Sequence, residues 1–148
     1  MIPDGSFSKK PHIKQFASTI VVAPNGHLLC QLRDDIPGII HRGCWTCCPG
    51  GSVEPGETHK EAVCREMKEE FNIKIKDIEL LTTFNLNGEF AGSYSIFTSK
   101  LASPISQVQC NEGQKAEFFS PQDVLKIGLP KIAARILKKY LARIEAHI

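Results

Sequence analysis

Three glutamates in one segment of the chain have the type and the spacing to bind a metal ion. Glu66, Glu69 and Glu70 fall within an arc of about 100° if the segment is helical, because each helical residue advances about 100°. Like charges four residues apart destabilise an isolated helix by about 0.2–0.5 kcal/mol per pair. The cluster is therefore unfavourable unless a cation or a basic partner occupies it. A solvated acidic face, held by pairs such as Glu61 with Arg65, is the alternative.

The chemistry that such a face would support is metal-assisted hydrolysis of a phosphorylated compound. Hard divalent cations bind carboxylate oxygens, and Mg²⁺ uses a few protein carboxylates together with water and phosphate oxygens. A bound metal would neutralise a diphosphate and lower the pKa of a coordinated water that attacks phosphorus. A nearby glutamate could take the proton of that water. The acidic face therefore indicates Mg²⁺ as the cofactor, with Mn²⁺ as a substitute.

The segment that carries these acids is predicted to be a helix. Thr58 and Glu61 have the spacing of a capping box, and residues 59–71 hold no glycine or proline. Val63 and Met67 would lie on the side opposite the acids, which suits a helix docked on a sheet. The sequence thus predicts a helix that buries one side and presents the acids on the other.

Strand-like segments precede this helix. Residues 16–23 and 27–33 are rich in β-branched and apolar side chains, and the Pro-Asn-Gly between them is typical of a turn, so a hairpin is predicted. Residues 34–43 hold a proline and two glycines and are expected to form a surface loop. A short strand is predicted over residues 45–48, and Pro49-Gly50-Gly51 is expected to turn sharply.

Further strands and a second long helix are predicted after it. Residues 78–86 and 90–101 form a second predicted hairpin around Asn87-Gly88-Glu89. Residues 121–127 are expected to make one or two helical turns. From Pro130 onward, apolar residues recur at the spacing of an amphipathic helix: Ile132, Ala133, Ile136, Leu137, Tyr140, Leu141 and Ile144.

Composition and charge are typical of one globular domain, which we expect to span residues 1–148. The chain is 42% apolar with a net charge of +2, and its basic residues are spread out, so the clustered basic face of a nucleic-acid-binding protein is missing. No export signal or bilayer-length apolar run occurs, so we expect no membrane segment and a cytoplasmic protein. The six cysteines are then expected to be free thiols.

The acids belong to a longer pattern that resembles the Nudix box. In that family the box reads Gly, five residues, Glu, seven residues, Arg-Glu, an apolar residue, any residue, Glu-Glu, any residue, Gly and an apolar residue. The single departure is Asn72 in place of the second Gly, and asparagine is the non-glycine residue that best tolerates a positive φ after a helix. The matching positions are Gly51, Glu57, Arg65, Glu66, Met67, Glu69, Glu70 and Ile73.

The resemblance implies a fold and a reaction. Nudix hydrolases have an α+β fold, an α/β/α sandwich with a mixed β-sheet, and two hairpins, a box helix and a C-terminal amphipathic helix suit it. Their reaction is Mg²⁺-dependent hydrolysis of the phosphoanhydride bond of a nucleoside diphosphate linked to another group, such as a nucleoside triphosphate or a nucleotide sugar. The implied partner is a small phosphorylated nucleotide, with no nucleic acid and no membrane, and a homodimer is left open.

Residue roles follow from the same resemblance. It implies that Glu66, Glu69 and Glu70 are metal ligands or the base, with Glu57 supporting them and Arg65 orienting a carboxylate. Glu66, Glu69 and Arg65 form the expected catalytic set. Substrate contacts are expected at Gly50, Gly51, Arg33 and Trp45.

A further metal ligand is predicted outside the box, at Glu112. Residues 111–119 resemble the Glu-Gly-Gln, then Glu-aromatic, segment of MutT-like pyrophosphohydrolases, in which the first Glu approaches the metals. Gly113 would allow this loop to bend inward. Glu117 and Glu89 are the alternative acids, and a solvated loop residue is the alternative role for Glu112.

Two other functions stay open. Isopentenyl-diphosphate isomerases share the Nudix fold and use a Cys just before the region of the box, a position that Cys47 or Cys48 would match, although the intact acids argue against it. A catalytically silent module that binds a nucleotide is the second alternative. Cys44 and Cys47 have the C-x-x-C spacing of a zinc or redox site, but no second pair of ligands follows.

The substrate itself is not determined by the sequence. The Pro that marks ADP-ribose enzymes past the box is replaced by Gly88, and the nearest candidate for the Tyr of dinucleoside polyphosphate enzymes is Tyr94, so neither marker fits. Several aromatic residues are candidates for stacking on a nucleobase or for the core: Trp45, Phe84, Phe90, Tyr94 and Phe97.

Overall fold

A seven-stranded sheet forms the middle layer of the protein in a computed structural model that describes residues 13–146. Its strands are β2 (Gln15–Val22), β3 (Leu28–Leu32), β4 (Trp45–Thr46), β5 (Gly50–Ser52), β6 (Ile75–Leu86), β7 (Gly92–Leu101) and β8 (Lys115–Phe119). The order along the sheet is β4-β3-β2-β7-β6, while β5 pairs with β2 and β8 pairs with β3. Because β8 pairs with β3 on the side opposite β2 and β4, the outer strands of the sheet are β8 and β6.

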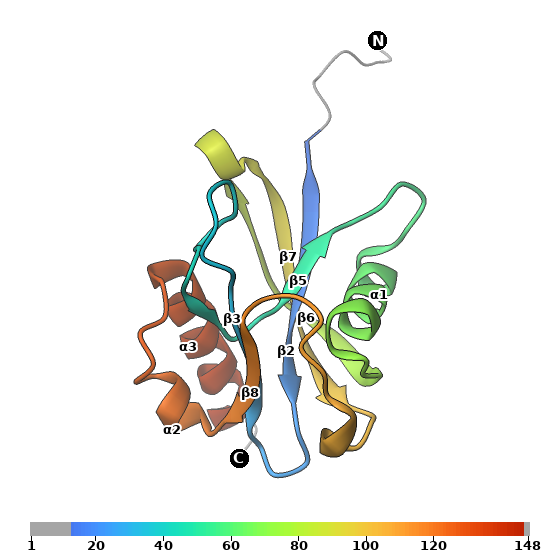
Figure 1. Ribbon diagram of the computed structural model, residues 1–148, viewed down its shortest axis with the longest axis vertical. Coiled ribbons are helices and arrows are strands. Elements are labelled where there is room, and N and C mark those ends of the chain that lie inside the picture. The colour runs from blue at the N-terminus through green and yellow to red at the C-terminus, as the bar shows by residue number, and fades with distance from the viewer. Residues whose placement is uncertain (1–12, 147–148) are drawn as a thin grey trace.

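Helices lie on both faces of the sheet (Figure 1). On one side is α1 (His59–Phe71), and on the other are α2 (Pro121–Val124) and α3 (Lys131–Glu145). Two short 3-10 helices, η1 (Gly88–Phe90) and η2 (Ile105–Gln107), lie in the connections. The predicted helices at residues 59–71, 121–127 and after Pro130 are therefore confirmed, and the helical turn after Pro121 is shorter than predicted.

The central strand β2 determines which side chains face each helical layer. It runs parallel to β7 and antiparallel to β3 and β5, so the sheet is mixed as predicted. Successive residues of a strand point to opposite faces. Ile20 packs in the apolar cluster that contains α3, and its neighbour Val21 packs in the cluster that contains α1. The fold is the predicted α/β/α sandwich of the α+β class.

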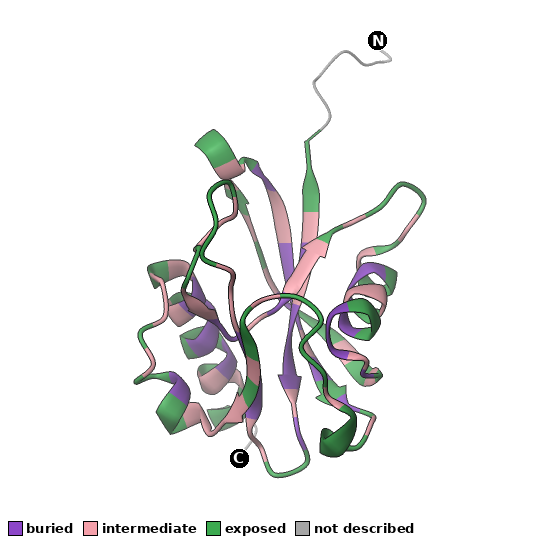
Figure 2. Cartoon of the chain, viewed as in Figure 1, coloured by how far each residue is buried: buried purple, intermediate pink, exposed green. Residues whose placement is uncertain are grey.

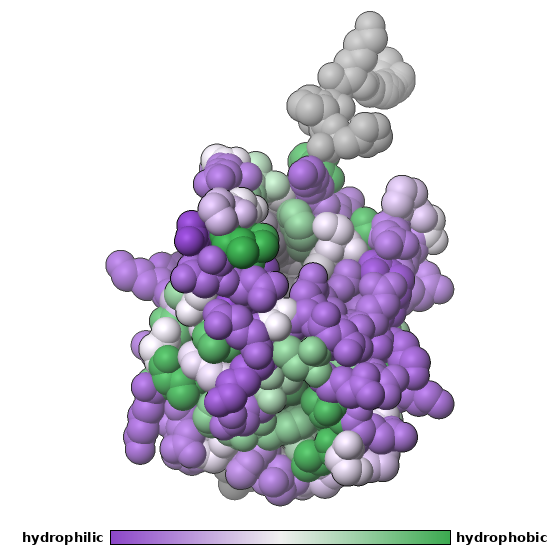
Figure 3. Space-filling view, in the orientation of Figure 1, coloured by the Kyte–Doolittle hydropathy of each residue, from purple (hydrophilic) through white to green (hydrophobic). Residues whose placement is uncertain are grey.

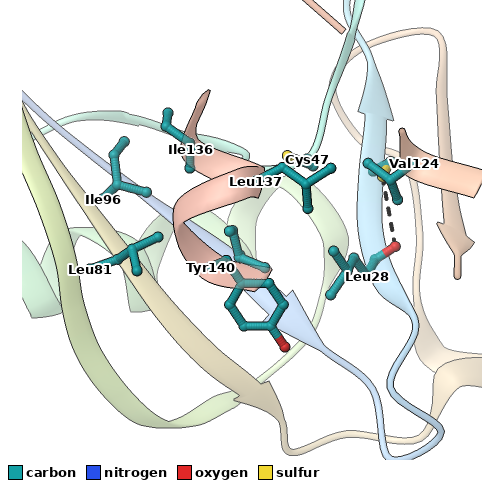
Figure 4. Packing of buried hydrophobic residues seen from close by; sticks show 10 residues of the cluster. Leu28, Cys47, Leu81, Ile96, Val124, Ile136, Leu137 and Tyr140 are labelled. Carbon is teal, nitrogen blue, oxygen red and sulfur yellow. Dashed lines mark hydrogen bonds between the residues drawn. The ribbon is translucent and has the colours of Figure 1, made fainter. Parts of the chain in front are cut away.

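Apolar packing holds each helix on the sheet. On the α3 side, Leu137 and Tyr140 pack against Ile96 of the sheet (Figure 4). On the α1 side, Met67 and Phe71 are fully buried. Buried positions follow the inner sides of α1 and α3 (Figure 2). Because burying a large apolar side chain contributes about 1.5–3 kcal/mol, these contacts fix the position of both helices.

Helix α1 begins and ends as its sequence predicts. The Thr58 hydroxyl accepts a hydrogen bond from the Glu61 amide, and the Glu61 carboxylate accepts one from the Thr58 amide, which is the predicted capping box. Asn72 ends the helix in the left-handed conformation, with φ of 56°. Val63 and Met67 are buried as predicted, but the acids do not all face outward: Glu69 is exposed, Glu66 is half-buried and Glu70 is buried.

Both predicted hairpins are present, with different details. The pairing between β2 and β3 is short, and in it Val22 lies opposite Leu28. The β6–β7 hairpin is connected by residues 87–91, which include η1, so its turn is longer than predicted. Strand β6 also begins at Ile75 rather than Ile78, because a bulge near Asp77, which has φ of 52°, interrupts the apolar pattern there.

The expectation that Pro49-Gly50-Gly51 turns sharply is wrong. Gly50 and Gly51 lie in β5 and pair with Ser18 and Ala17 of β2, and the chain bends earlier, at residues 47–48. A Cβ added to Gly50 would lie 2.2 Å from the Ala17 carbonyl oxygen. The glycine is therefore required for close approach of two strands and not for a turn.

The six cysteines are all free, as predicted. Among residues 13–146, no helix is both long and apolar enough to cross a membrane. The outer surface over α1 is predominantly hydrophilic (Figure 3), in line with an acidic helix face exposed beside the site described next.

Candidate active site

Three carboxylates meet where α1 faces the loop that precedes β8. Glu66 and Glu70 come from α1, and Glu112 comes from the loop. Each offers one oxygen, and these atoms all lie within 4.8 Å of one another. Glu70 is buried, with 4% of its surface exposed, whereas Glu112 lies at the open side. We call Glu66, Glu70 and Glu112 the carboxylate cluster.

The loop of Glu112 is held in place by hydrogen bonds to α1 and β3. The Asn111 amide donates to the Glu70 carbonyl oxygen at 2.8 Å, and its side-chain amide donates to the Glu69 carbonyl oxygen at 3.0 Å. The Gln31 side-chain amide donates to the Glu112 carbonyl oxygen at 2.9 Å. The structure thus brings Glu112 to the acids of the box helix.

The two alternative acids for this position lie elsewhere. Glu117 lies on β8, where its carboxylate is 3.5 Å from the Lys115 ammonium. Glu89 lies in η1 and lines a different cavity. Glu112 is therefore the one of these three that joins Glu66 and Glu70.

Glu70 lacks a cationic partner within the described part of the chain. No lysine, arginine or histidine of residues 13–146 forms an ion pair with it, and its neutral contact is the Gln31 amide at 3.4 Å. Burial, then a hydrogen bond with Glu66 and the charge of Glu112, raise the pKa of Glu70 to about 10. The donor set, all carboxylate oxygen, fits Mg²⁺ or Mn²⁺.

The stability of the metal-free protein is expected to fall as the pH rises. Glu70 would ionise near its ordinary pKa of 4.5 in the unfolded chain, but its pKa is about 10 in the folded protein. The folded state therefore binds more protons between these values, and the stabilisation that is complete below about pH 4.5 is lost as the pH approaches 10. Denaturant unfolding in EDTA at acidic and alkaline pH measures this slope. Glu70→Gln should remove most of it, and an unchanged slope in that variant would contradict the assignment.

Arg65 organises the remaining acids of the box. Its guanidinium donates to Glu57 at 2.7 and 3.0 Å, to Glu66 at 3.1 Å, and to the Ser52 carbonyl oxygen at 2.9 Å. A further bond of 3.3 Å reaches Glu69. The hydrogen bonds from Arg65 lower the pKa of Glu57. Arg65 thus links the end of β5 to α1 and holds the Glu66 carboxylate toward the cluster.

The carboxylate cluster is smaller than the ligand set expected from the sequence. Glu57 is bound by Arg65, and Glu69 has a side chain that is 59% exposed, so the structure brings neither of them into the cluster. The alternative pair of Glu61 with Arg65 is also absent from the described ion pairs, because Glu61 caps the helix. The acidic face is therefore divided between a cluster and an arginine-bound rim.

Gly51 lies directly against the cluster. A Cβ at this position would lie 2.6 Å from one Glu66 carboxylate oxygen. The backbone of β5 can approach the Glu66 side chain this closely because Gly51 has no side chain. The first Gly of the box is therefore explained by space for a carboxylate.

Two cavities adjoin each other at β5. One, of about 380 Å³, contains the carboxylate cluster, and the other, of about 390 Å³, lies between the sheet and α3. They are called the phosphate cavity and the nucleoside cavity after the ligand parts that are proposed for them below. Five residues line both, so the two cavities share a boundary: Arg33, Ile39, Gly50, Gly51 and Ser52.

Stacked aromatic rings form one wall of the nucleoside cavity. The Tyr94 ring lies between Phe16, at a centroid distance of 4.6 Å, and Phe84, at 5.1 Å, with all three rings nearly parallel. Phe90 also lines this cavity. Phe97 is instead buried in the core against α1. The candidates from the sequence thus divide into a cavity wall and core residues.

The expected substrate contacts are partly brought together. Gly50, Gly51 and Arg33 line both cavities, and the Arg33 Nε donates to the Ile40 carbonyl oxygen at 2.8 Å. Trp45 does not line either cavity. Its ring packs edge-on against Phe119 at 5.2 Å and against the core, because β4 directs it away from the cavity. The expectation that Trp45 contacts substrate is therefore not supported by its position.

The cysteines do not form a metal site in the described part of the chain. Among residues 13–146, the side chains that could together hold a metal ion are those of the carboxylate cluster, which contains no cysteine. Cys47 is fully buried, with its thiol 3.9 Å from the Ala133 carbonyl oxygen. Cys48 lines the nucleoside cavity. Cys44 precedes β4 and Cys47 follows it, and within the described residues neither belongs to a group of side chains that could hold a metal ion.

Two residues of the site were missed by the sequence analysis. Gln31 is buried and contacts both Glu70 and the loop of Glu112, and its signal was a polar residue within an apolar strand. Phe16 lines the nucleoside cavity from β2. No local pattern distinguishes it from a core residue, since only the pairing of β2 with β7 places it beside Tyr94.

Comparisons with known proteins agree with this geometry. The family model of the NUDIX domain matches residues 14–141. No match was found among curated protein sequences. Among solved structures, the chain is similar to a MutT NUDIX hydrolase from Burkholderia pseudomallei, with a TM-score of 0.72, 21% identity, and coverage of 87% of this chain and 98% of that chain.

Two further structures are similar across most of their length. One is the NUDIX domain of Shewanella oneidensis NrtR complexed with ADP ribose, with a TM-score of 0.75, 16% identity, and coverage of 91% of this chain and 90% of that chain. The other is a C. elegans Ap4A hydrolase, with a TM-score of 0.67, 24% identity, and coverage of 90% and 99%. At these identities the structures establish the fold, and because the family model spans most of the sequence, this chain belongs to the NUDIX domain family.

Proposed function

We propose that this chain is a Mg²⁺-dependent pyrophosphohydrolase, with Mn²⁺ as a substitute, acting on the phosphoanhydride bond of a nucleoside diphosphate linked to another group. The observation that carries the proposal is the contact between the two cavities. Glu66, Glu70 and Glu112 meet in one, and the aromatic wall lies in the next. A substrate with its diphosphate in the phosphate cavity and its aromatic base in the nucleoside cavity would suit the side chains of both cavities.

The metal would be held by Glu66, Glu70 and Glu112. When bound, Mg²⁺ neutralises phosphate oxygens and lowers the pKa of a coordinated water. Arg65 fixes the Glu66 carboxylate, which is the orienting role expected from the resemblance. Glu69, with an exposed carboxylate at the rim, remains available to accept a proton.

The diphosphate would cross β5. Gly50 and Gly51 lie at the boundary of the two cavities, where their backbone is not covered by a side chain of their own. Arg33 lines both cavities. A guanidinium is suited to phosphate because it can donate two parallel hydrogen bonds. The nucleoside would then lie against Phe84, Phe90 and Tyr94, where stacking tolerates any aromatic base.

The substrate class is supported by the similar structures but not narrowed to one compound. ADP ribose, bound by the Shewanella oneidensis domain, and Ap4A, the substrate named for the C. elegans enzyme, each contain a nucleoside diphosphate linked to another group. A screen of nucleoside triphosphates, nucleotide sugars, ADP ribose and dinucleoside polyphosphates with Mg²⁺ should release a nucleoside monophosphate or inorganic pyrophosphate from at least one of them. Absence of turnover with every class would favour the catalytically silent module.

The isomerase alternative has a separate test. Cys47 is buried against α3 and cannot meet a substrate without rearrangement, which leaves Cys48 as the cysteine in the cavity. Incubation with isopentenyl diphosphate should leave it unchanged. Conversion to the dimethylallyl isomer, abolished by Cys48→Ser, would replace the hydrolase proposal.

A further inference from the structure

A third cavity lies between the edge strand β6 and helix α3. It has a volume of about 320 Å³ and is called here the edge groove. Helix α3 is held along β6 by the Arg143 guanidinium, which donates to the Leu80 carbonyl oxygen at 3.1 Å, and by the Lys139 ammonium, which donates to the Thr82 hydroxyl at 3.4 Å. Beyond these contacts the groove is open. Its lining residues are Thr82, Phe84, Asn85, Leu86, Ile132, Arg135, Ile136 and Lys139.

The charges of the edge groove have one sign. Arg135 and Lys139 are exposed and lie four residues apart on α3, and no acidic residue lines the groove. Like charges at this spacing repel each other on a helix. Within residues 13–146, Arg135 forms no ion pair and no hydrogen bond through its side chain. Neither cation has an acidic partner among the ion pairs of the described residues, and an anion in the groove would supply one to both.

The floor of the edge groove is aromatic and apolar. Phe84 is the last ring of the Phe16–Tyr94–Phe84 stack, so Tyr94 covers one of its faces and no aromatic ring of the described residues covers the other. Phe84 lines the groove beside Ile132 and Ile136. A planar ring inserted here would extend the stack by one member, and such offset stacking is favourable.

We propose that the edge groove is a second nucleotide-binding site, which takes an aromatic base against Phe84 and its phosphate on Arg135 and Lys139. The volume of the edge groove, about 320 Å³, lies in the range of pockets that bind small molecules. Phe84, Ile132 and Ile136 also line the nucleoside cavity, so a ligand in the groove would contact the wall of the proposed active site. This site goes beyond the proposed hydrolysis and contains none of the carboxylate cluster.

The direct test is a titration of adenosine 5′-monophosphate into the ¹⁵N-labelled chain in excess EDTA. The amides of Thr82 and Asn85, which line the edge groove and neither of the other cavities, should shift. Adenosine and inorganic phosphate should each bind there at least about tenfold more weakly, because each lacks one of the two recognised parts. Equal binding of adenosine would overturn the role of the two cations, and equal binding of phosphate would overturn the role of Phe84.

Charge-removing variants test the residues. Arg135→Gln combined with Lys139→Gln should weaken adenosine monophosphate binding at the groove by at least about tenfold. Lys138→Gln is the matched control, because it removes a neighbouring exposed charge that does not line the groove, and it should change the affinity by less than about twofold. The same loss in Lys138→Gln would show attraction to net charge alone and overturn the site.

The result of the adenosine monophosphate titration does not depend on whether the chain is a hydrolase. Shifts confined to Ser18 and Thr46 would place the nucleotide in the nucleoside cavity and contradict the second site. A chain that hydrolyses no diphosphate but shows shifts at Thr82 would overturn the proposed hydrolysis and keep the edge groove. A chain that hydrolyses a diphosphate but shows no shifts at Thr82 would support the proposed hydrolysis and overturn the edge groove.

Discussion

Replacing Glu70 with Gln is expected to lower the hydrolysis rate by more than about a hundredfold, because metal assistance contributes several kcal/mol and each 1.4 kcal/mol is about tenfold. Glu70 is the buried member of the carboxylate cluster, and no lysine, arginine or histidine of the described chain forms an ion pair with it. Gln keeps the shape and removes the charge. The measurement is kcat at saturating substrate as Mg²⁺ is increased.

The same variant should need more Mg²⁺ for half-maximal rate while remaining folded. The variant should still unfold cooperatively at neutral pH. The Gln amide carries no charge, so burying it does not require a proton as burying the Glu70 carboxyl does. Glu61→Gln is the matched control on the same helix, because Glu61 belongs to the capping box and lies outside the cluster. Wild-type turnover in Glu70→Gln, or an equal loss in Glu61→Gln, would remove Glu70 from the site.

Replacing Gly50 with Ala is expected to lower the free energy of unfolding by at least about 2 kcal/mol, as forced overpacking in a tight interior does. The added Cβ would meet the Ala17 carbonyl oxygen at 2.2 Å and the Ser18 Cα at 2.5 Å, and both of these atoms are backbone. Neither can rotate away, so β5 would have to separate from β2. Chemical denaturation measures the loss.

Gly51→Ala provides the contrast. Its Cβ would meet the Glu66 carboxylate, which is the end of a side chain and can move. This variant should therefore keep more stability than Gly50→Ala while losing activity, because a displaced Glu66 leaves the carboxylate cluster. If Gly51→Ala retains wild-type turnover, the position of Glu66 is not critical, and if Gly50→Ala is as stable as wild type, the close approach of β5 and β2 is incorrect.

Local signals in the sequence predicted the helices and the composition of the box well. The capping box at Thr58 and the left-handed Asn72 depend on residues within a turn or two, so their sequence spacing determines them. The apolar period after Pro130 likewise places Leu137 and Tyr140 in the core. Glu112 was reached through the resemblance, and the hydrogen bonds of Asn111 supply its physical basis.

Non-local pairing explains what the sequence could not show. In the sequence, Gly50 and Gly51 have the composition of a turn. They are needed because β5 lies very close to β2 and to the Glu66 side chain, and a contact with distant residues cannot be recognised from the local sequence. Trp45 was expected at the substrate, but the short β4 directs it to Phe119. Helical spacing grouped Glu69 with Glu66, and it could not show that Arg65 would bind both Glu57 and Glu69 outside the cluster.

The most direct test of the central claim is turnover of the best substrate from the screen, measured with Mg²⁺ and again in excess EDTA, with products identified. The carboxylate cluster predicts phosphoanhydride cleavage to a nucleoside monophosphate or pyrophosphate that stops on chelation and returns when Mg²⁺ or Mn²⁺ is restored. Full turnover in excess EDTA would contradict a metal-dependent site at Glu66, Glu70 and Glu112.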